Sequence, residues 1–163
     1  MTKINQPTRR TLLAGLGTAI WLSGAQDQPP NFAGTWKLDV ARSSSDRYAL
    51  PQAMTLAVVQ ESTKITLHQT MQWQNVPPRE VHLSYATDGT ESKNTFDDGT
   101  VLSSAAKWES AKLIIDWKST SGSDEQHGRS LLSLSDGPAL TYATSAADTH
   151  GAYEMIFVFV KSA

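Results

Sequence analysis

The chain has 163 residues, 18% of them charged, a formal net charge of −2 and no cysteine. This length suits one domain with a core of its own. The lack of cysteine excludes disulfides, cysteine nucleophiles, thiolate metal sites, haem attached through cysteine and a cysteine-linked lipid anchor, and the charge balance argues against nucleic acid or an anionic membrane as partner.

Residues 1–25 have the pattern of an export signal, and 26–163 remain as one domain. Lys3, Arg9 and Arg10 precede an apolar run at 11–22, and three small residues end at a predicted cleavage site after Ala25. The paired arginines resemble the twin-arginine signal of bacteria, with an ordinary secretory signal as the alternative. Without these three basic residues, the 14 Lys and Arg fall to 11 against 16 Asp and Glu, a net charge of −5. We expect a periplasmic or secreted protein without a stable membrane anchor, because the apolar run is too short to span a bilayer.

Strand-like runs recur through the rest of the chain at the spacing of a sandwich or barrel. Most connections after residue 61 are short, which favours strands that are antiparallel neighbours in chain order. The sequence therefore predicts an all-β fold, an up-and-down antiparallel β-barrel of about ten strands. The runs lie near 34–40, 54–61, 64–74, 79–87, 90–96, 100–108, 112–119, 128–135, 139–145 and 153–161.

Three Asp-Gly pairs, at 88–89, 98–99 and 136–137, predict tight hairpin turns, because glycine accepts the positive φ that such turns require. Longer connections are expected at 41–53, 74–79, 119–128 and 145–152. The first could hold a helical turn or a lid, and the third is polar and expected to be flexible.

The first strand opens with Gly34 and Trp36 in the run NFAGTWKL. This opening, followed by many short strands, resembles the calycin superfamily, which includes lipocalins, fatty-acid-binding proteins and avidins. It is also similar to small exported bacterial proteins with a GTWKL opening and no assigned activity. The resemblance implies a barrel around a small hydrophobic ligand, with Trp36 plugging one end beneath a basic side chain near the chain's end, for which Lys161 is the candidate. The residues after Trp36 match neither the biotin contacts of avidins nor the opening of the haem-binding branch, so we expect no cofactor.

Alternation along the strands sorts apolar side chains onto one face and polar ones onto the other. Five polar residues nevertheless fall in phase with the apolar face: Gln60, Gln69, Ser92, Asn94 and Ser104. Because burying an unpaired polar group is costly, such residues favour an internal ligand or water. The alternative is that the two glutamines lie at barrel ends in contact with solvent. If a cavity exists, the predicted ligand-binding residues are Gln60, Gln69, Tyr85, Phe96, Trp117, Tyr142 and Phe157.

The last strand is apolar on both faces, which indicates cover on both sides. We expect the segment around Phe32 to cover it rather than a second subunit, and hence a monomer. Four histidines offer candidate chemistry. His68 and His82 are predicted to point outward from neighbouring strands, but no third ligand is evident, so no metal site is predicted. His127 and His150 are predicted in loops, where they could line one end of the barrel.

Hydrolytic motifs are missing: there is no Gly-x-Ser-x-Gly, no His-Glu-x-x-His and no phosphate-binding glycine loop. No catalytic residue is predicted. The leading hypothesis is an exported protein that binds a small hydrophobic or amphipathic molecule inside the barrel. A filled barrel acting as an envelope interaction or inhibitor module is the alternative, and an enzyme using the loop histidines is the third.

Overall fold

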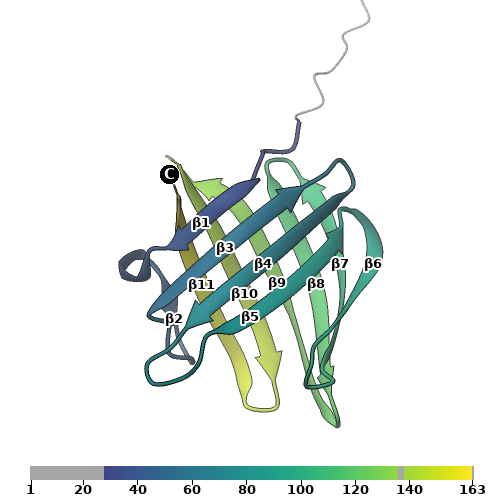
Figure 1. Cartoon of the computed structure of the whole chain (residues 1–163). Helices are drawn as coiled ribbons and strands as arrows, with labels where there is room; N and C mark the ends of the chain where they lie inside the picture. Colours follow the sequence, from purple (N-terminus) through teal and green to yellow (C-terminus); the bar gives the residue numbers. More distant parts are fainter. Residues whose placement is uncertain (1–27, 136–137, 163) are drawn as a thin grey trace, which may run out of the picture.

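Ten antiparallel strands wrap into a barrel in a computed structural model, which describes residues 28–135 and 138–162 (Figure 1). The barrel strands are β1 (Gly34–Leu38), β3 (Ala53–Gln60), β4 (Lys64–Gln72), β5 (Arg79–Ala86), β6 (Asp88–Thr95), β7 (Val101–Glu109), β8 (Lys112–Ser121), β9 (Asp124–Ser135), β10 (Ala139–Asp148) and β11 (Gly151–Lys161). A two-residue strand, β2 (Ser44–Ser45), pairs with β11 outside this path. The export signal predicted at 1–25 and the turn predicted at 136–137 lie outside the described residues.

The strands follow one another around the barrel in the order β5-β4-β3-β1-β11-β10-β9-β8-β7-β6. This up-and-down arrangement, with all ten strands, confirms the predicted fold class. β1 joins the first and last parts of the chain, because Trp36 lies opposite Leu56 of β3 on one side and Lys161 of β11 on the other. No helix in the described ranges is long and apolar enough to cross a membrane.

The first strand is shorter than predicted. It ends at Leu38, and Val40–Arg42 form a 3₁₀ turn whose cap, Asp39, accepts a hydrogen bond from the backbone N–H of Arg42 at 3.3 Å. Val40 is accordingly 40% exposed rather than on the inner face. The helical turn anticipated within 41–53 thus begins one residue earlier.

Both predicted Asp-Gly turns in the described region are confirmed as places where the chain reverses. The β6–β7 hairpin turns at Gly99, where φ is 81° and the N–H donates to the Phe96 carbonyl at 2.9 Å. The chain also reverses at Asp88-Gly89, between β5 and β6. Hydrogen bonds join Ser84 to Asn94 and Ala86 to Ser92 across these two strands, so the reversal is centred on Gly89, where φ is 89°. The β6–β7 ladder is irregular at the same place, between Asp88 and Glu91.

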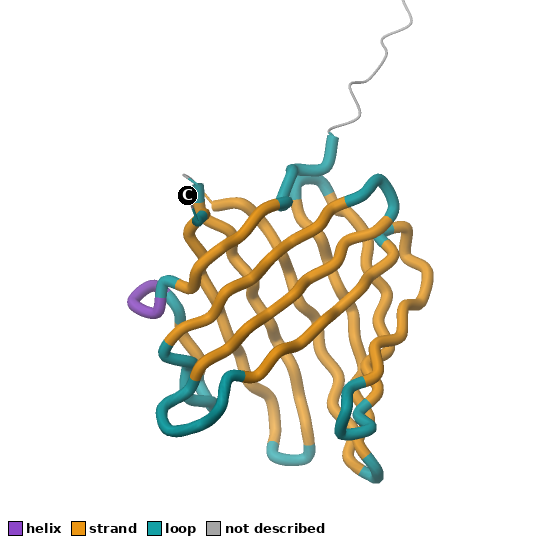
Figure 2. The backbone as a smooth tube through the Cα atoms, in the orientation of Figure 1, coloured by secondary structure: helices purple, strands orange, loops and turns teal. Residues whose placement is uncertain are grey.

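Two predicted loops are mostly strand. The ladders of β8–β9 and β10–β11 continue to Ser121–Asp124 and Asp148–Gly151, leaving two residues at each turn. The polar composition of 119–128 suggested a flexible loop, but it reflects strands that are largely exposed to water. Figure 2 shows both hairpins extending from the barrel at one end.

Both ends of the described chain lie at the same end of the barrel (Figure 1), and we call it the closed end because aromatic side chains are buried there. Phe32 and Trp36 are 0% and 2% exposed, and the Trp36 indole N–H donates to the Phe32 carbonyl at 2.9 Å. Phe32 packs on Trp108 with ring centres 5.3 Å apart. The prediction that the Phe32 segment covers the outer face of β11 is therefore wrong: the ring turns inward because the closed end offers complete burial.

The outer face of β11 stays partly uncovered. Ile156 and Val160 are 38% and 40% exposed, whereas Val158 is buried. The backbone of Val158 is held by the chain just after β1: its carbonyl accepts from the Asp39 N–H at 2.8 Å, and its N–H donates to Ser43 Oγ at 3.0 Å.

Gly34 explains why the first strand opens as it does. Its φ is +129°, a backbone conformation that side chains rarely permit, and a Cβ would lie 3.0 Å from the Cε atom of Lys161. The open space lets the lysine side chain reach Trp36, whose ring centre lies 5.4 Å from the ammonium nitrogen. This is the arrangement that the calycin resemblance implied for Trp36 and Lys161, and it suits a cation–π interaction.

Candidate ligand cavity

The half of the barrel away from the closed end contains a cavity of about 390 Å³. Its walls come from inward-facing side chains of β4, β5 and β7 to β11 and from the segment 48–51. Of the seven predicted ligand-binding residues, six line this cavity: Gln69, Tyr85, Phe96, Trp117, Tyr142 and Phe157. The interior is thus neither uniformly filled nor uniformly hollow.

Gln60 does not line the cavity, and its prediction as a ligand-binding residue is corrected. Its Oε1 accepts from the Phe32 N–H at 2.8 Å, and its Nε2 donates to the Pro30 carbonyl at 3.0 Å. The amide therefore holds the N-terminal segment in place at the closed end. The alternative interpretation of Gln60 as a residue at a barrel end is the one that the structure supports.

Trp117 forms one fixed wall of the cavity. Its indole N–H donates to Ser130 Oγ at 3.0 Å, and Ser130 Oγ lies 2.9 Å from Thr144 Oγ1. Gly128 lies opposite Trp117 in the β8–β9 ladder, and a Cβ there would lie 2.7 Å from the indole ring and 2.7 Å from Ala146 Cβ. The ring can occupy this position only because residue 128 has no side chain.

Two tyrosines add hydroxyl groups deep in the barrel. Burial raises the pKa of Tyr85 well above its ordinary value, and the neighbouring Tyr142 acts in the same direction. Burial also raises the pKa of Tyr142, while interactions with the hydroxyls of Ser130 and Tyr85 act the other way. Both phenols stay protonated at neutral pH, so the cavity presents them as neutral donors and acceptors.

Gln69 brings an amide to the same space. The residue is 7% exposed and lines the cavity. An amide that faces a cavity can pair with a ligand or an internal water.

A cluster of side chains, which we call the clasp, covers part of the cavity mouth. The clasp consists of Arg47 and Tyr48 in the segment after β2, and Asp148 and Tyr153 in the β10–β11 hairpin. Arg47 Nη1 lies 2.8 Å from both carboxylate oxygens of Asp148. The Arg47 guanidinium lies 4.9 Å from the Tyr153 ring centre, and the Tyr48 and Tyr153 rings meet edge to face at 5.1 Å.

The charges of the clasp stabilise one another. The pKa of Asp148 is lowered, first by the hydrogen bond from the His150 backbone N–H and then by Arg47. The pKa of Arg47 is raised by its hydrogen bond to Asp148. Sequence reasoning missed the clasp, because nothing in the local pattern links two residues 101 positions apart.

The lining of the cavity itself is uncharged. Among the described residues that line it, none is Asp, Glu, Lys, Arg or His. The polar groups present are hydroxyls, amides and indoles. Such a surface can hold a hydroxyl or carbonyl group by hydrogen bonds, but it has no cation to neutralise a buried carboxylate.

Ser92, Asn94 and Ser104, which were considered as signs of an internal ligand or water, form hydrogen bonds to neighbouring strands instead. β5 and β6 are adjacent but share no backbone ladder, and their side chains join them along what we call the seam. Asn94 accepts from the Ser84 N–H at 2.8 Å and donates to its carbonyl at 3.2 Å. Ser92 Oγ accepts from the Ala86 N–H at 2.8 Å. Ser104 Oγ donates to the Ser92 carbonyl at 3.4 Å.

The seam ends before the strands do. Beyond it, an outer groove of about 580 Å³ lies between residues 78–82 and 95–98. Val81 and Phe96 line both this groove and the internal cavity. The seam side of the barrel is therefore the place where inner and outer spaces come closest.

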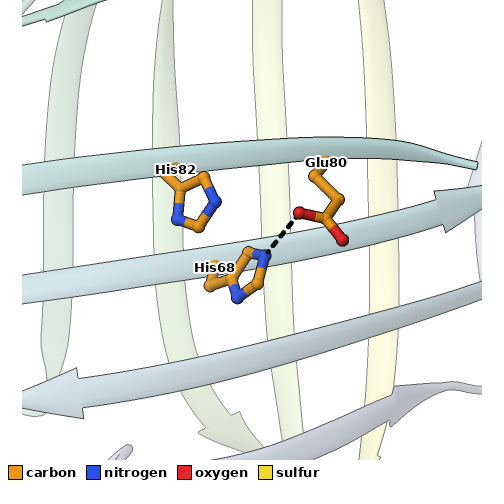
Figure 3. A group of neighbouring side chains, drawn as sticks. All are labelled: His68, Glu80 and His82. Carbon is orange, nitrogen blue, oxygen red and sulfur yellow. Dashed lines mark ion pairs between the residues drawn. The ribbon is translucent and has the colours of Figure 1, made fainter.

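The four histidines all lie outside the cavity lining. His127 lies on β9, exposed and facing outward, and His150 is exposed in the β10–β11 turn. The prediction that both lie in loops is thus wrong for His127. His68 and His82 do point outward from β4 and β5, and the structure adds the missing third group, Glu80, beside them (Figure 3).

Known proteins resemble this chain in structure alone. No protein-family model matches the chain, and neither does any curated protein. A solved structure of zebrafish ileal bile acid-binding protein with cholic acid matches with a TM-score of 0.55 at 18% identity, over 80% of this chain and 98% of that one. The fold is that of a fatty-acid-binding-protein-like barrel.

Two further solved structures agree with this assignment of the fold. A fatty acid transporter named REP1-NXSQ matches with a TM-score of 0.51 at 14% identity, over 80% of this chain and 96% of that one. The fluorescent protein UnaG matches with a TM-score of 0.50 at 15% identity, over 80% and 97%. These neighbours are binding or transport proteins by name, or a fluorescent protein, at identities that establish the fold and nothing finer.

Proposed function

We propose that this chain is a binding protein that holds one uncharged amphipathic small molecule in the cavity. The observation that carries the proposal is the cavity itself: about 390 Å³, lined by aromatic side chains and by a few converging polar groups. Ligand sites in proteins typically have this size and this composition. The structural neighbours named for bile acid and fatty acid support the same class of ligand.

The uncharged lining favours a neutral ligand over an ionised one. A carboxylate deep in the barrel would have to give up its hydration without a cation in return. Arg47, a cation of the clasp at the mouth, already donates to Asp148. A hydroxyl or carbonyl group, by contrast, can pair with the Gln69 amide or with the Ser130 and Thr144 hydroxyls.

The test compares two probes that differ only in the head group, a fluorescent long-chain alcohol and the corresponding carboxylic acid. We expect saturable one-to-one binding of the alcohol, with weaker binding of the ionised acid. Gln69→Leu should weaken alcohol binding by about three- to tenfold, the worth of one hydrogen bond. Native mass spectrometry of protein purified from its own host should show a bound organic molecule.

Gln60→Leu is the matched control, because it makes the same chemical change outside the cavity. It should lower stability, since it releases Phe32 and Pro30, and leave probe affinity unchanged. Failure of both probes to bind, together with a ligand-free protein from the native host, would sink the proposal. Equal effects of the two glutamine substitutions on affinity would remove Gln69 from the site.

We further propose that the chain is exported by bacteria to the periplasm or beyond. The support is the sequence of residues 1–25, with Arg9 and Arg10 before the apolar run. Replacing both arginines by lysine should retain the precursor in the cytoplasm if the twin-arginine route is used. Fractionation and immunoblotting would measure this, and unchanged export would indicate the ordinary secretory route instead.

A further inference from the structure

Three potential metal ligands meet on the outer face of β4 and β5. His68 and His82 are direct partners in the β4–β5 ladder, and Glu80 lies two residues before His82, on the same face of β5. Figure 3 shows the Glu80 carboxylate facing the His68 ring, with the His82 ring beside it. One ligand atom from each residue lies within 4.8 Å of the others.

The His68 ring points its Nε2 atom into this group without a partner. The side chain is 40% exposed, but Nε2 itself is covered and has no hydrogen bond. The nearest carboxylate oxygen, Glu80 Oε2, lies at 3.6 Å, too far for a hydrogen bond. A covered ring nitrogen without a hydrogen-bond partner, close to a carboxylate and a second imidazole, is a position at which a metal cation could bind.

We propose that His68, Glu80 and His82 form a binding site for a divalent transition-metal ion, with Zn²⁺ as the best match. Two imidazoles and one carboxylate are ligands that zinc prefers, and a water molecule would complete a four-coordinate shell. Imidazole-rich sites select such ions over Mg²⁺ and Ca²⁺, which favour oxygen ligands alone.

The rearrangement needed for coordination is small. Ligand atoms around tetrahedral zinc lie roughly 3.3 Å apart, so the three atoms must approach by about an ångström or slightly more. The two imidazole rings are now stacked, with centres 3.9 Å apart and planes 18° apart. Both nitrogens can reach one ion after the rings rotate about their side-chain bonds, and exposure of all three side chains leaves room for this.

The charges near the site favour a cation. Glu80 and His82 border the outer groove, and the same groove is lined by Asp97 and Asp98. Arg79 also lines it and is the opposing charge. The pKa of Asp98 is lowered first by the hydrogen bond from the Thr100 backbone N–H and only to a smaller extent by Arg79. The acidic groups outnumber the one basic group around the groove.

The test uses protein without a histidine tag, titrated with ZnCl₂ alone in a calorimeter at about pH 7.5, where imidazoles are largely neutral. We expect one saturable site per chain and a higher unfolding temperature when zinc is present. His68→Gln and His82→Gln should each weaken binding at least about tenfold, and Glu80→Gln should weaken it too. Mg²⁺ and Ca²⁺ at the same concentration should give no saturable heat.

His127→Gln is the matched control, because it also removes an exposed, outward-facing histidine from a strand. It should leave zinc affinity unchanged, as should His150→Gln. All variants should keep the circular dichroism spectrum of the parent, since the substituted side chains lie on the surface. No saturable zinc binding would overturn the proposal, and so would binding that survives loss of both His68 and His82.

Discussion

Trp36 combines burial, a hydrogen bond and a cation in one side chain. It is 2% exposed, donates to the Phe32 carbonyl and lies beneath the Lys161 ammonium. Trp36→Ala should lower the free energy of unfolding by about 3–5 kcal/mol, since it leaves a large cavity at the closed end. Urea denaturation followed by circular dichroism measures the change, and an unaltered midpoint would refute the role of Trp36 as a plug.

Residue 128 must be glycine because the Trp117 ring occupies the space that a Cβ would fill. Gly128→Ala should lower the free energy of unfolding by roughly 1–3 kcal/mol, because the new Cβ meets the indole ring and Ala146. It should also move the ring away from Ser130 and change tryptophan emission. Gly122→Ala makes a useful comparison, because a Cβ there meets no atom within 4 Å and any cost comes from its positive φ. A Gly128→Ala protein with the tryptophan emission of the parent would show that the new Cβ is accommodated by movement of other atoms and not of the Trp117 ring.

At the scale of elements, the seam is the weakest junction in the barrel wall. β5 and β6 are held by side chains where every other neighbouring pair has a backbone ladder. Asn94→Ala should lower the free energy of unfolding by about 1–3 kcal/mol, because it leaves the Ser84 N–H and carbonyl unpaired. Hydrogen exchange should accelerate at the Ser84 amide and not at Leu67, inside the β3–β4 ladder. Equal exchange at both amides would argue for global loss of stability instead.

The clasp should respond to acid with a definite sign. The folded-state pKa of Asp148 lies below its unfolded value of about 3.9, so its contribution is present above that pH and is lost as the pH falls through the folded pKa. Asp148→Asn keeps the shape of the side chain and removes the charge. The difference in unfolding free energy between parent and variant should be largest above about pH 4 and shrink toward pH 2. A difference that does not change with pH would exclude the charge of Asp148 as its cause.

For the whole molecule, we expect the closed end of the barrel to contribute most to stability and the opposite end to control ligand exchange. The closed end contains the buried rings of Phe32 and Trp36, whereas the clasp covers part of the mouth of the cavity. If the proposed ligand binding holds, Arg47→Met should speed ligand release by about three- to tenfold in stopped-flow displacement, because a lid held by fewer contacts opens more often. Trp36→Phe, at the closed end, should leave the release rate unchanged. A faster release rate in both variants would mean that release depends on the overall stability of the barrel and not on the clasp.

Much of this architecture could be predicted because a strand sorts its side chains with a period of two. That rule identified all ten strands and placed Gln69, Trp117 and four other lining residues on the inner face. It could not separate Asn94, which bonds to a neighbouring strand, from Gln69, which faces the cavity, since both have the same phase. The Arg47–Asp148 pair was also beyond reach, because residues so far apart in the chain leave no local pattern. Glu80 was visible as a residue on the same face as His82, but its closeness to His68 depends on register.

The seam has a consequence for self-association. A ladder-closed barrel has no free strand edges, but here the edges of β5 and β6 meet and are kept from other strands mainly by Asn94 and Ser92. An edge released from its partner is a template on which another chain can add a strand. Small polar side chains at the seam thus protect a protein of this topology from forming intermolecular β-structure. Proteins with a weakened seam should aggregate well before their cores unfold.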